Sequence, residues 1–166
     1  MLIAGLLLAH HFRFEILYLC HRRLLRSAAE PHGVPPRLLA AVVWQESRFR
    51  ARSLGPAGEI GLMQIMPSAA GEWARAVGVT NLAPTDLLAP RTNLMAGAWY
   101  LGRALQRWRE QTDPEACALA EYNAGPANAA RWARAADRTG KPFVEQIDYP
   151  ATRRYVIEVL RRYRGR

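Results

Sequence analysis

The chain has 166 residues, half of them hydrophobic, and a net charge of +9. This length and composition fit one globular domain with a sizeable core, and they exclude a disordered chain. The 23 basic residues against 14 acidic ones favour an anionic partner, such as nucleic acid, a membrane surface or a polyanionic cell-wall polymer. The arginines are spread over every segment without a zinc-finger or RNP-like pattern, so we expect no nucleic-acid partner. The cysteines and histidines do not stand at metal-ligand spacing, so we expect neither a metal nor a cofactor.

The chain opens with an apolar run from Met1 to Ala9. This run is too short to span a bilayer, which needs about 20 apolar residues, so we expect no integral membrane span. It also lacks the basic segment that begins a signal peptide. We interpret residues 1–29 as an apolar, helical N-terminal extension, with a degenerate leader as the alternative, and residues 30–166 as the main domain.

Helical periodicity, with proline and glycine at the boundaries, predicts a series of helices. They comprise residues 12–30, a helix from Pro35-Pro36 to the loop of residues 50–59, residues 67–77, a short piece near residues 86–88, and residues 93–108, 114–121, 127–136 and 152–162. Alternation typical of strands is scarce and the loops are short. The sequence therefore predicts an all-α fold, a single compact domain of about six to eight helices.

The helix that follows Pro35-Pro36 carries an acid on its apolar face. Glu46 stands four residues after Val42 and three after Val43, and therefore on the same side of the helix. One interpretation is structural: the carboxylate reaches solvent at the rim or pairs with an arginine. The other is functional, because an acid that lines a cleft has a raised pKa and can donate a proton near neutral pH.

Three other stretches differ from the prevailing mixture of Ala, Leu and Arg. They are Gly61-Leu-Met-Gln-Ile-Met-Pro67, Glu121-Tyr-Asn-Ala-Gly-Pro126 and Tyr149-Pro-Ala-Thr-Arg-Arg-Tyr-Val156. Taken singly, each has a structural explanation, since methionine fills cores, a tyrosine and an asparagine can end a helix, and Tyr155 can be a core residue.

In this order, and together with Trp44-Gln-Glu-Ser47, these stretches resemble the catalytic domain of soluble lytic transglycosylases, the lysozyme-like SLT family. The resemblance covers about residues 30–163. It implies a lysozyme-like helical domain and a peptidoglycan lytic transglycosylase. Such an enzyme cleaves the MurNAc-β-1,4-GlcNAc bond without water and leaves 1,6-anhydromuramoyl ends.

The resemblance also implies a role for each matching residue. Glu46 would be the single catalytic group, first as general acid and then as general base. The substrate-binding residues would be Gln64, Met66, Tyr122, Asn123 and Tyr155. Of these, Gln64 and Met66 would line the sugar groove, while Tyr155 would close the site from the last helix.

Two positions depart from the family pattern. Gly55 stands where the family often has a serine that acts on the acetamido group of the substrate, and Glu59 stands where alanine is frequent. Glu59 is either a solvated loop acid or, if it faces the cleft, a second carboxylate.

The sequence is also compatible with two other functions. One is a lysozyme-type muramidase, in which Glu59 or an acid such as Glu121 positions a water. Another is a weakly active or inert peptidoglycan-binding module. The expected partner is the peptidoglycan glycan strand, in the periplasm or cell envelope, and the context is wall turnover or a secretion, conjugation or phage assembly. We expect a monomer, since the sequence has no coiled-coil heptads.

Overall fold

The computed structural model describes residues 2–165 and, of these, the side chains from residue 12 onward. Within these residues the chain forms eight α-helices and two short 3₁₀ helices, and no β-sheet. The α-helices are α1 (Leu2–Ala29), α2 (Pro36–Ser47), α3 (Pro67–Val77), α4 (Pro90–Arg107), α5 (Pro114–Ala124), α6 (Pro126–Thr139), α7 (Phe143–Gln146) and α8 (Pro150–Arg164); the 3₁₀ helices are η1 (Glu30–His32) and η2 (Pro84–Leu88). The predicted all-α fold is confirmed.

Proline opens most of these helices. It is the first residue of α2, α3, α4, α5, α6 and α8. Proline suits this position because its fixed φ is already helical and its missing N–H would have no partner there. For the same reason α4, α6 and α8 begin one to three residues earlier than predicted, at prolines 90, 126 and 150. The prolines therefore fix where these six helices start.

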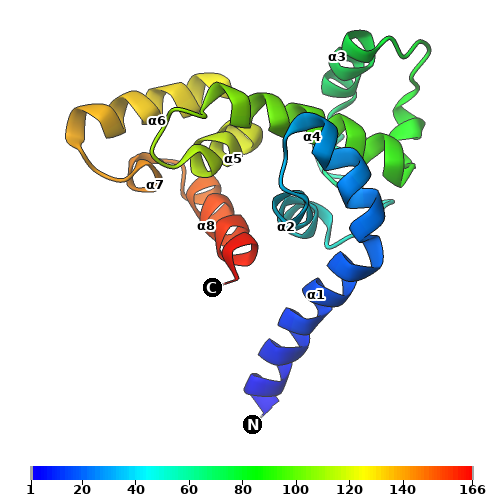
Figure 1. Cartoon of the computed structure of the whole chain (residues 1–166), viewed down its shortest axis with the longest axis horizontal. Helices are drawn as coiled ribbons and strands as arrows, with labels where there is room; N and C mark the ends of the chain where they lie inside the picture. Colours follow the sequence, from blue (N-terminus) through cyan, green and yellow to red (C-terminus); the bar gives the residue numbers. More distant parts are fainter. Residues whose placement is uncertain (1, 166) are drawn as a thin grey trace.

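α5 is the central helix of the domain. It packs against α4, α6 and α8 (Figure 1), and its five consecutive residues 116–120 are all buried. Four of these five are alanine or cysteine, and such small side chains allow neighbouring helices to approach on every side. Cys117 is the buried cysteine of this run, whereas Cys20 is exposed on α1, and both are free thiols.

The N-terminal helix is longer than the predicted 12–30 segment. α1 already begins at Leu2, so most of the apolar run is helical, and Met1 lies outside the described residues. Its later turns pack against α2 and α4, with Phe14 and Leu25 buried. Arg37 of α2 fastens this helix through two hydrogen bonds to Glu15, of 2.6 and 3.0 Å. Within the described part of the chain, no helix combines the length and apolarity of a membrane span.

The loop between α2 and α3 is held by one buried amide. Asn93 of α4 donates hydrogen bonds from Nδ2 to the carbonyls of Ile60, at 2.7 Å, and Leu87, at 3.0 Å. Its Oδ1 accepts from the backbone N–H of Met63 at 2.8 Å. At Gly61 the backbone has a φ of 81°, and a Cβ there would overlap the Asn93 amide. The loop therefore lies directly on α4, in the position where it can form the floor of a site.

Candidate active site

Glu46 and Tyr155 meet where α2 crosses α8. The Tyr155 hydroxyl donates a hydrogen bond of 2.7 Å to Oε1 of Glu46. Tyr155 is buried, with 7% of its surface exposed, while Glu46 is half-buried. The end of α2 is fixed by Ser47, whose buried hydroxyl donates to the carbonyl of Leu62 at 2.8 Å. Glu46 is therefore held between the last helix and the α2–α3 loop.

The electrostatics of Glu46 favour its protonated form. Burial raises the pKa of Glu46 to about 7, against an ordinary value of 4.5. The hydrogen bond from Tyr155 lowers this pKa, and the charge of Glu59 raises it. Burial outweighs the hydrogen bond, because removing the carboxylate from water penalises its charged form most. Near neutral pH this side chain can therefore both donate and accept a proton.

Tyr122 joins this pair from α5. Its hydroxyl donates to the carbonyl of Met63 at 2.8 Å, so the ring is tied to the loop that forms the floor. Burial raises the pKa of both Tyr122 and Tyr155 well above 10, and the charge of Glu46 adds to both shifts. Both phenols therefore remain neutral donors beside Glu46 at any physiological pH.

Gln64 and Met66 lie on the same loop and line a groove of about 420 Å³ together with Tyr122. Gln64 adopts a left-handed backbone with a φ of 48°. Its Nε2 donates to the carbonyls of Gly61, at 2.9 Å, and Ser53, at 3.3 Å, so that Oε1 is the end of the amide left for other contacts. Met66 is 38% exposed at the start of α3.

The structure does not bring every predicted residue into this groove. Glu46 and Tyr155 are not among the residues that line it, and Tyr122 connects them to it. Asn123 follows Tyr122 near the end of α5, and its side chain is exposed. Its predicted role in substrate binding stays a prediction.

The groove is also lined by Glu72, Arg103 and Arg107, which the sequence did not single out. Tyr100 lines it too, as does Glu121, which the sequence offered only as an acid that could position a water. Tyr100 donates a hydrogen bond of 2.6 Å to Glu72. Tyr100, Arg103 and Arg107 follow one another at helical spacing on α4, and this spacing is the sequence signal that could have revealed them.

Glu121 is occupied by its neighbours. One carboxylate oxygen accepts a hydrogen bond of 2.7 Å from Nε1 of Trp108, and the other pairs with Arg107. This arrangement ties α5 to the end of α4. Glu121 is thus less available to position a water than the muramidase alternative requires.

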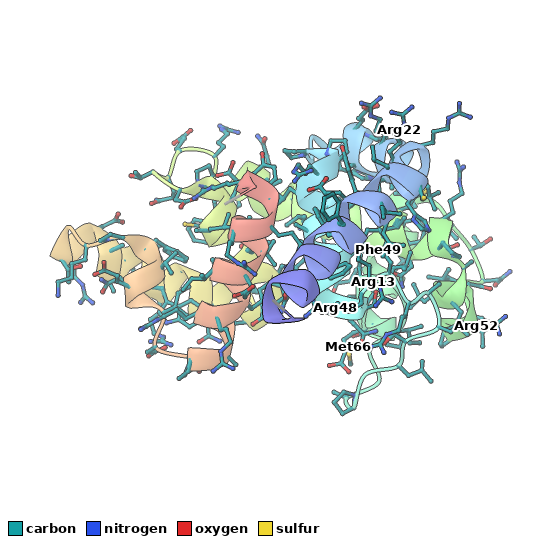
Figure 2. All side chains as sticks on the ribbon, turned by 90° about the horizontal axis from the view of Figure 1, so that it is seen from below. Arg13, Arg22, Arg48, Phe49, Arg52 and Met66 are labelled. Atoms are coloured by element: carbon teal, nitrogen blue, oxygen red, sulfur yellow. The ribbon has the colours of Figure 1, made fainter. Side chains whose placement is uncertain are left out.

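Arginine side chains surround the end of α2. The guanidinium of Arg48 lies 5.0 Å from the centre of the Trp44 ring, and that of Arg162, from α8, lies 5.3 Å from the same ring. The contact from Arg162 joins the helix of Tyr155 to the helix of Glu46, whereas Arg48 packs back on the end of its own helix. Figure 2 shows Arg48 and Phe49 near Arg13 of α1, and these residues line one shallow surface pocket.

Taken together, the site offers a half-buried acid of pKa about 7, two neutral phenols and a groove lined by amide, thioether and charged groups. Among the residues with described side chains, no three His, Cys, Asp or Glu gather as metal ligands would. The arrangement suits proton transfer to and from a ligand that lies in the groove.

Comparison with known proteins gives consistent matches. The soluble lytic murein transglycosylase of Escherichia coli strain K12 is 33% identical over 162 residues, which cover 95% of this chain and 24% of that protein. The 70-kDa soluble lytic transglycosylase in complex with bulgecin A superposes with a TM-score of 0.82 at 30% identity, over 97% of this chain and 26% of that one.

A second solved structure is an inactive Glu-to-Gln mutant of the lytic transglycosylase Slt from Pseudomonas aeruginosa. It gives a TM-score of 0.75 at 29% identity, over 86% of this chain and 23% of that one. This chain thus spans about a quarter of the length of these relatives. The family model described as the transglycosylase SLT domain matches residues 23–142. The chain therefore belongs to the transglycosylase SLT domain family.

Proposed function

We propose that this chain is a peptidoglycan lytic transglycosylase that uses Glu46 as its single acid/base. The observation that carries the proposal is the half-buried Glu46, with a pKa of about 7 and a hydrogen bond from Tyr155. The family and the relatives named as murein transglycosylases support the reaction class. The inactive Slt relative supports the choice of a glutamate, since it carries a single Glu-to-Gln change.

In the first step, protonated Glu46 donates its proton to the glycosidic oxygen, and the bond from that oxygen to C1 of the muramic sugar breaks. The sugar becomes oxocarbenium-like, and the new carboxylate stabilises its positive charge. The Tyr155 hydroxyl then supports the carboxylate through its 2.7 Å hydrogen bond. A pKa near 7 suits this exchange, because the group must both lose and regain the proton.

In the second step, the Glu46 carboxylate takes the proton from the C6 hydroxyl of the same sugar. The C6 oxygen forms a bond to C1, which closes a 1,6-anhydro ring and restores protonated Glu46. Atoms balance without water, since the substrate supplies its own nucleophile. One acid is therefore enough, whereas most glycosidases need two carboxylates.

The groove supports a glycan substrate. Gln64, Met66 and Tyr122 line it, and we assign them to sugar binding together with the exposed Asn123, which follows Tyr122 on α5. The net charge of +9 favours a polymer that bears lactyl and peptide carboxylates. Such a substrate implies action in the periplasm or at the cell envelope, in keeping with relatives named as membrane-bound murein transglycosylases.

Mass spectrometry of the products tests the proposal. Purified peptidoglycan is incubated with the wild type, with Glu46→Gln and with Glu110→Gln, a matched change at an exposed acid. We expect anhydromuropeptides from the wild type and the control, and none from Glu46→Gln. Reducing-end products would instead indicate a muramidase, and binding without any release would indicate an inert module.

A further inference from the structure

The carboxylate of Glu59 covers the α-carbon of Gly55. A Cβ built on Gly55 would overlap Oε2 and Cδ of Glu59, and it would lie 2.8 Å from Oε1 of Gln64. A real Cβ does not approach other atoms so closely, so no side chain fits at position 55 while Glu59 holds this conformation. The glycine at position 55 and the acid at position 59 therefore depend on each other, and together they form one combined feature: the Glu59 carboxylate occupies the space that a side chain at position 55 would need.

Backbone hydrogen bonds fold Glu59 back over Gly55. The N–H of Gly55 donates to the carbonyl of Glu59 at 2.8 Å, and the N–H of Gly58 donates to the carbonyl of Gly55 at 3.2 Å. The N–H of Ala57 donates to Oε2 of Glu59 at 2.9 Å. These bonds close a tight turn and orient the half-buried carboxylate, so Glu59 is not a freely solvated loop acid.

This turn lies at the site already described. Gln64 lines the groove, and its Oε1 approaches the same point above Gly55 as Oε2 of Glu59. Nε2 of Gln64 donates to two backbone carbonyls, and this leaves Oε1 of Gln64 on the side of Glu59. Oε1 is therefore a second acceptor beside the Glu59 carboxylate. The charge of Glu59 also reaches Glu46, whose pKa it raises. Two acceptors side by side favour a ligand that brings a donor.

We infer that Glu59 is a substrate-binding residue that accepts a hydrogen bond from the acetamido N–H of a sugar bound beside Glu46. It would do so from the place that a side chain at position 55 would otherwise occupy. An ionised carboxylate can only accept, and the acetamido N–H is the donor that N-acetylated sugars have and glucose lacks. The inference rests on the proposed function only in taking an N-acetylated glycan as the ligand.

Binding to two matched sugars tests this role without catalysis. In a Glu46→Gln background, NMR titration measures the affinity for the β-1,4 tetramer of N-acetylglucosamine and for the β-1,4 tetramer of glucose. We expect Glu59→Ala to weaken binding of the N-acetylated tetramer by about tenfold or more, as for a lost hydrogen bond to a charged group. The glucose tetramer should bind as before, and Glu110→Ala should change neither affinity. An equal loss on both tetramers, or no loss, would overturn the inference.

The combined feature gives a sharper second test. Gly55→Ser alone should also weaken binding, because its Cβ displaces Glu59. Gly55→Ser with Glu59→Ala should recover affinity for the N-acetylated tetramer, since a hydroxyl then occupies the vacated place once Oε1 of Gln64, the far end of its side chain, shifts away from the new Cβ. A double variant that binds more weakly than either single variant would contradict the exchange.

The pKa of Glu46 supplies a readout that needs no substrate. Glu59→Gln keeps an acceptor for the N–H of Ala57 but removes the charge that faces Glu46. Tyr155 from α8 and Tyr122 from α5, the other titratable groups coupled to Glu46, are unchanged. Carboxyl-carbon NMR should show a lower pKa for Glu46 in this variant. An unchanged pKa would contradict the placement of Glu59 at the site, whichever products the enzyme releases.

Discussion

The Tyr155 hydroxyl and the Glu46 carboxylate form a 2.7 Å hydrogen bond between residues that stand 109 positions apart in the chain. The bond stabilises the charged carboxylate, and burial stabilises the neutral acid. Burial has the larger effect, so the pKa of Glu46 rises to about 7. The pairing of α2 with α8 thus tunes the acid as well as positioning it.

Replacing the acid should stop the reaction. Glu46→Gln keeps the shape of the side chain but cannot transfer a proton, and general acid–base catalysis contributes about 10² to 10⁴ in rate. We expect anhydromuropeptide release to fall by at least this factor, while binding of peptidoglycan is retained. Activity near that of the wild type would assign the proton transfer to another group.

Removing the tyrosine hydroxyl should shift the pH profile upward. Tyr155→Phe removes the hydrogen bond that lowers the pKa of Glu46, so this pKa should rise further above 7. Because the reaction begins with protonated Glu46, the basic limb of kcat/KM should move to higher pH. The rate should also fall, since the carboxylate formed in the first step loses its support. A profile with the same basic limb would argue against the coupling.

Glu46 should make the wild type less stable at alkaline pH. Its pKa is about 7 in the folded chain and about 4.5 unfolded, so its stabilising contribution is complete below pH 4.5 and is lost as pH rises through 7. The loss is about 3 kcal/mol at most. Urea unfolding at about pH 4.5 and about pH 8.5 measures this effect. The free energy of unfolding of Glu46→Gln, relative to that of the wild type, should be higher at about pH 8.5 than at about pH 4.5. A difference that is independent of pH would contradict the raised pKa.

The buried amide that holds the loop should contribute strongly to stability. Asn93→Ala leaves the N–H of Met63 and the carbonyls of Ile60 and Leu87 without this partner, and each lost buried hydrogen bond costs about 1–3 kcal/mol. We expect the free energy of unfolding to fall by about 3 kcal/mol or more. Gln106→Ala, at an exposed amide on α4, serves as control and should be near neutral.

Most of the fold could be predicted from the sequence, because periodicity and proline mark the helices. The acid on the apolar face of α2 was recognisable for the same reason, since Val42 and Val43 are fully buried and Glu46 follows them. Because they begin at prolines, α4, α6 and α8 start one to three residues earlier than predicted. α1 starts at Leu2, whereas the sequence predicted a helix from residue 12. The division of the chain at residue 29 stays a prediction.

The loop contacts could not be predicted in this way. The turn that brings Glu59 over Gly55 has no periodicity, and the sequence left two alternatives for that acid. The stripe of Tyr100, Arg103 and Arg107 was hidden for a different reason. The apolar face of the same helix gives the stronger signal, and the groove beneath the stripe exists only once α3 and α5 pack beside α4.

The prolines that open the helices also set the directions in which the functional side chains point, because the number of residues from the proline determines the angle around the helix axis. Glu46 is reached from Pro36, Tyr122 from Pro114 and Tyr155 from Pro150, each along an uninterrupted helix. Since each helical residue turns the chain by about 100°, inserting one residue between a proline and its functional side chain would rotate that side chain away from its partners in the site. Evolution can therefore lengthen the loops of this domain more readily than these three intervals.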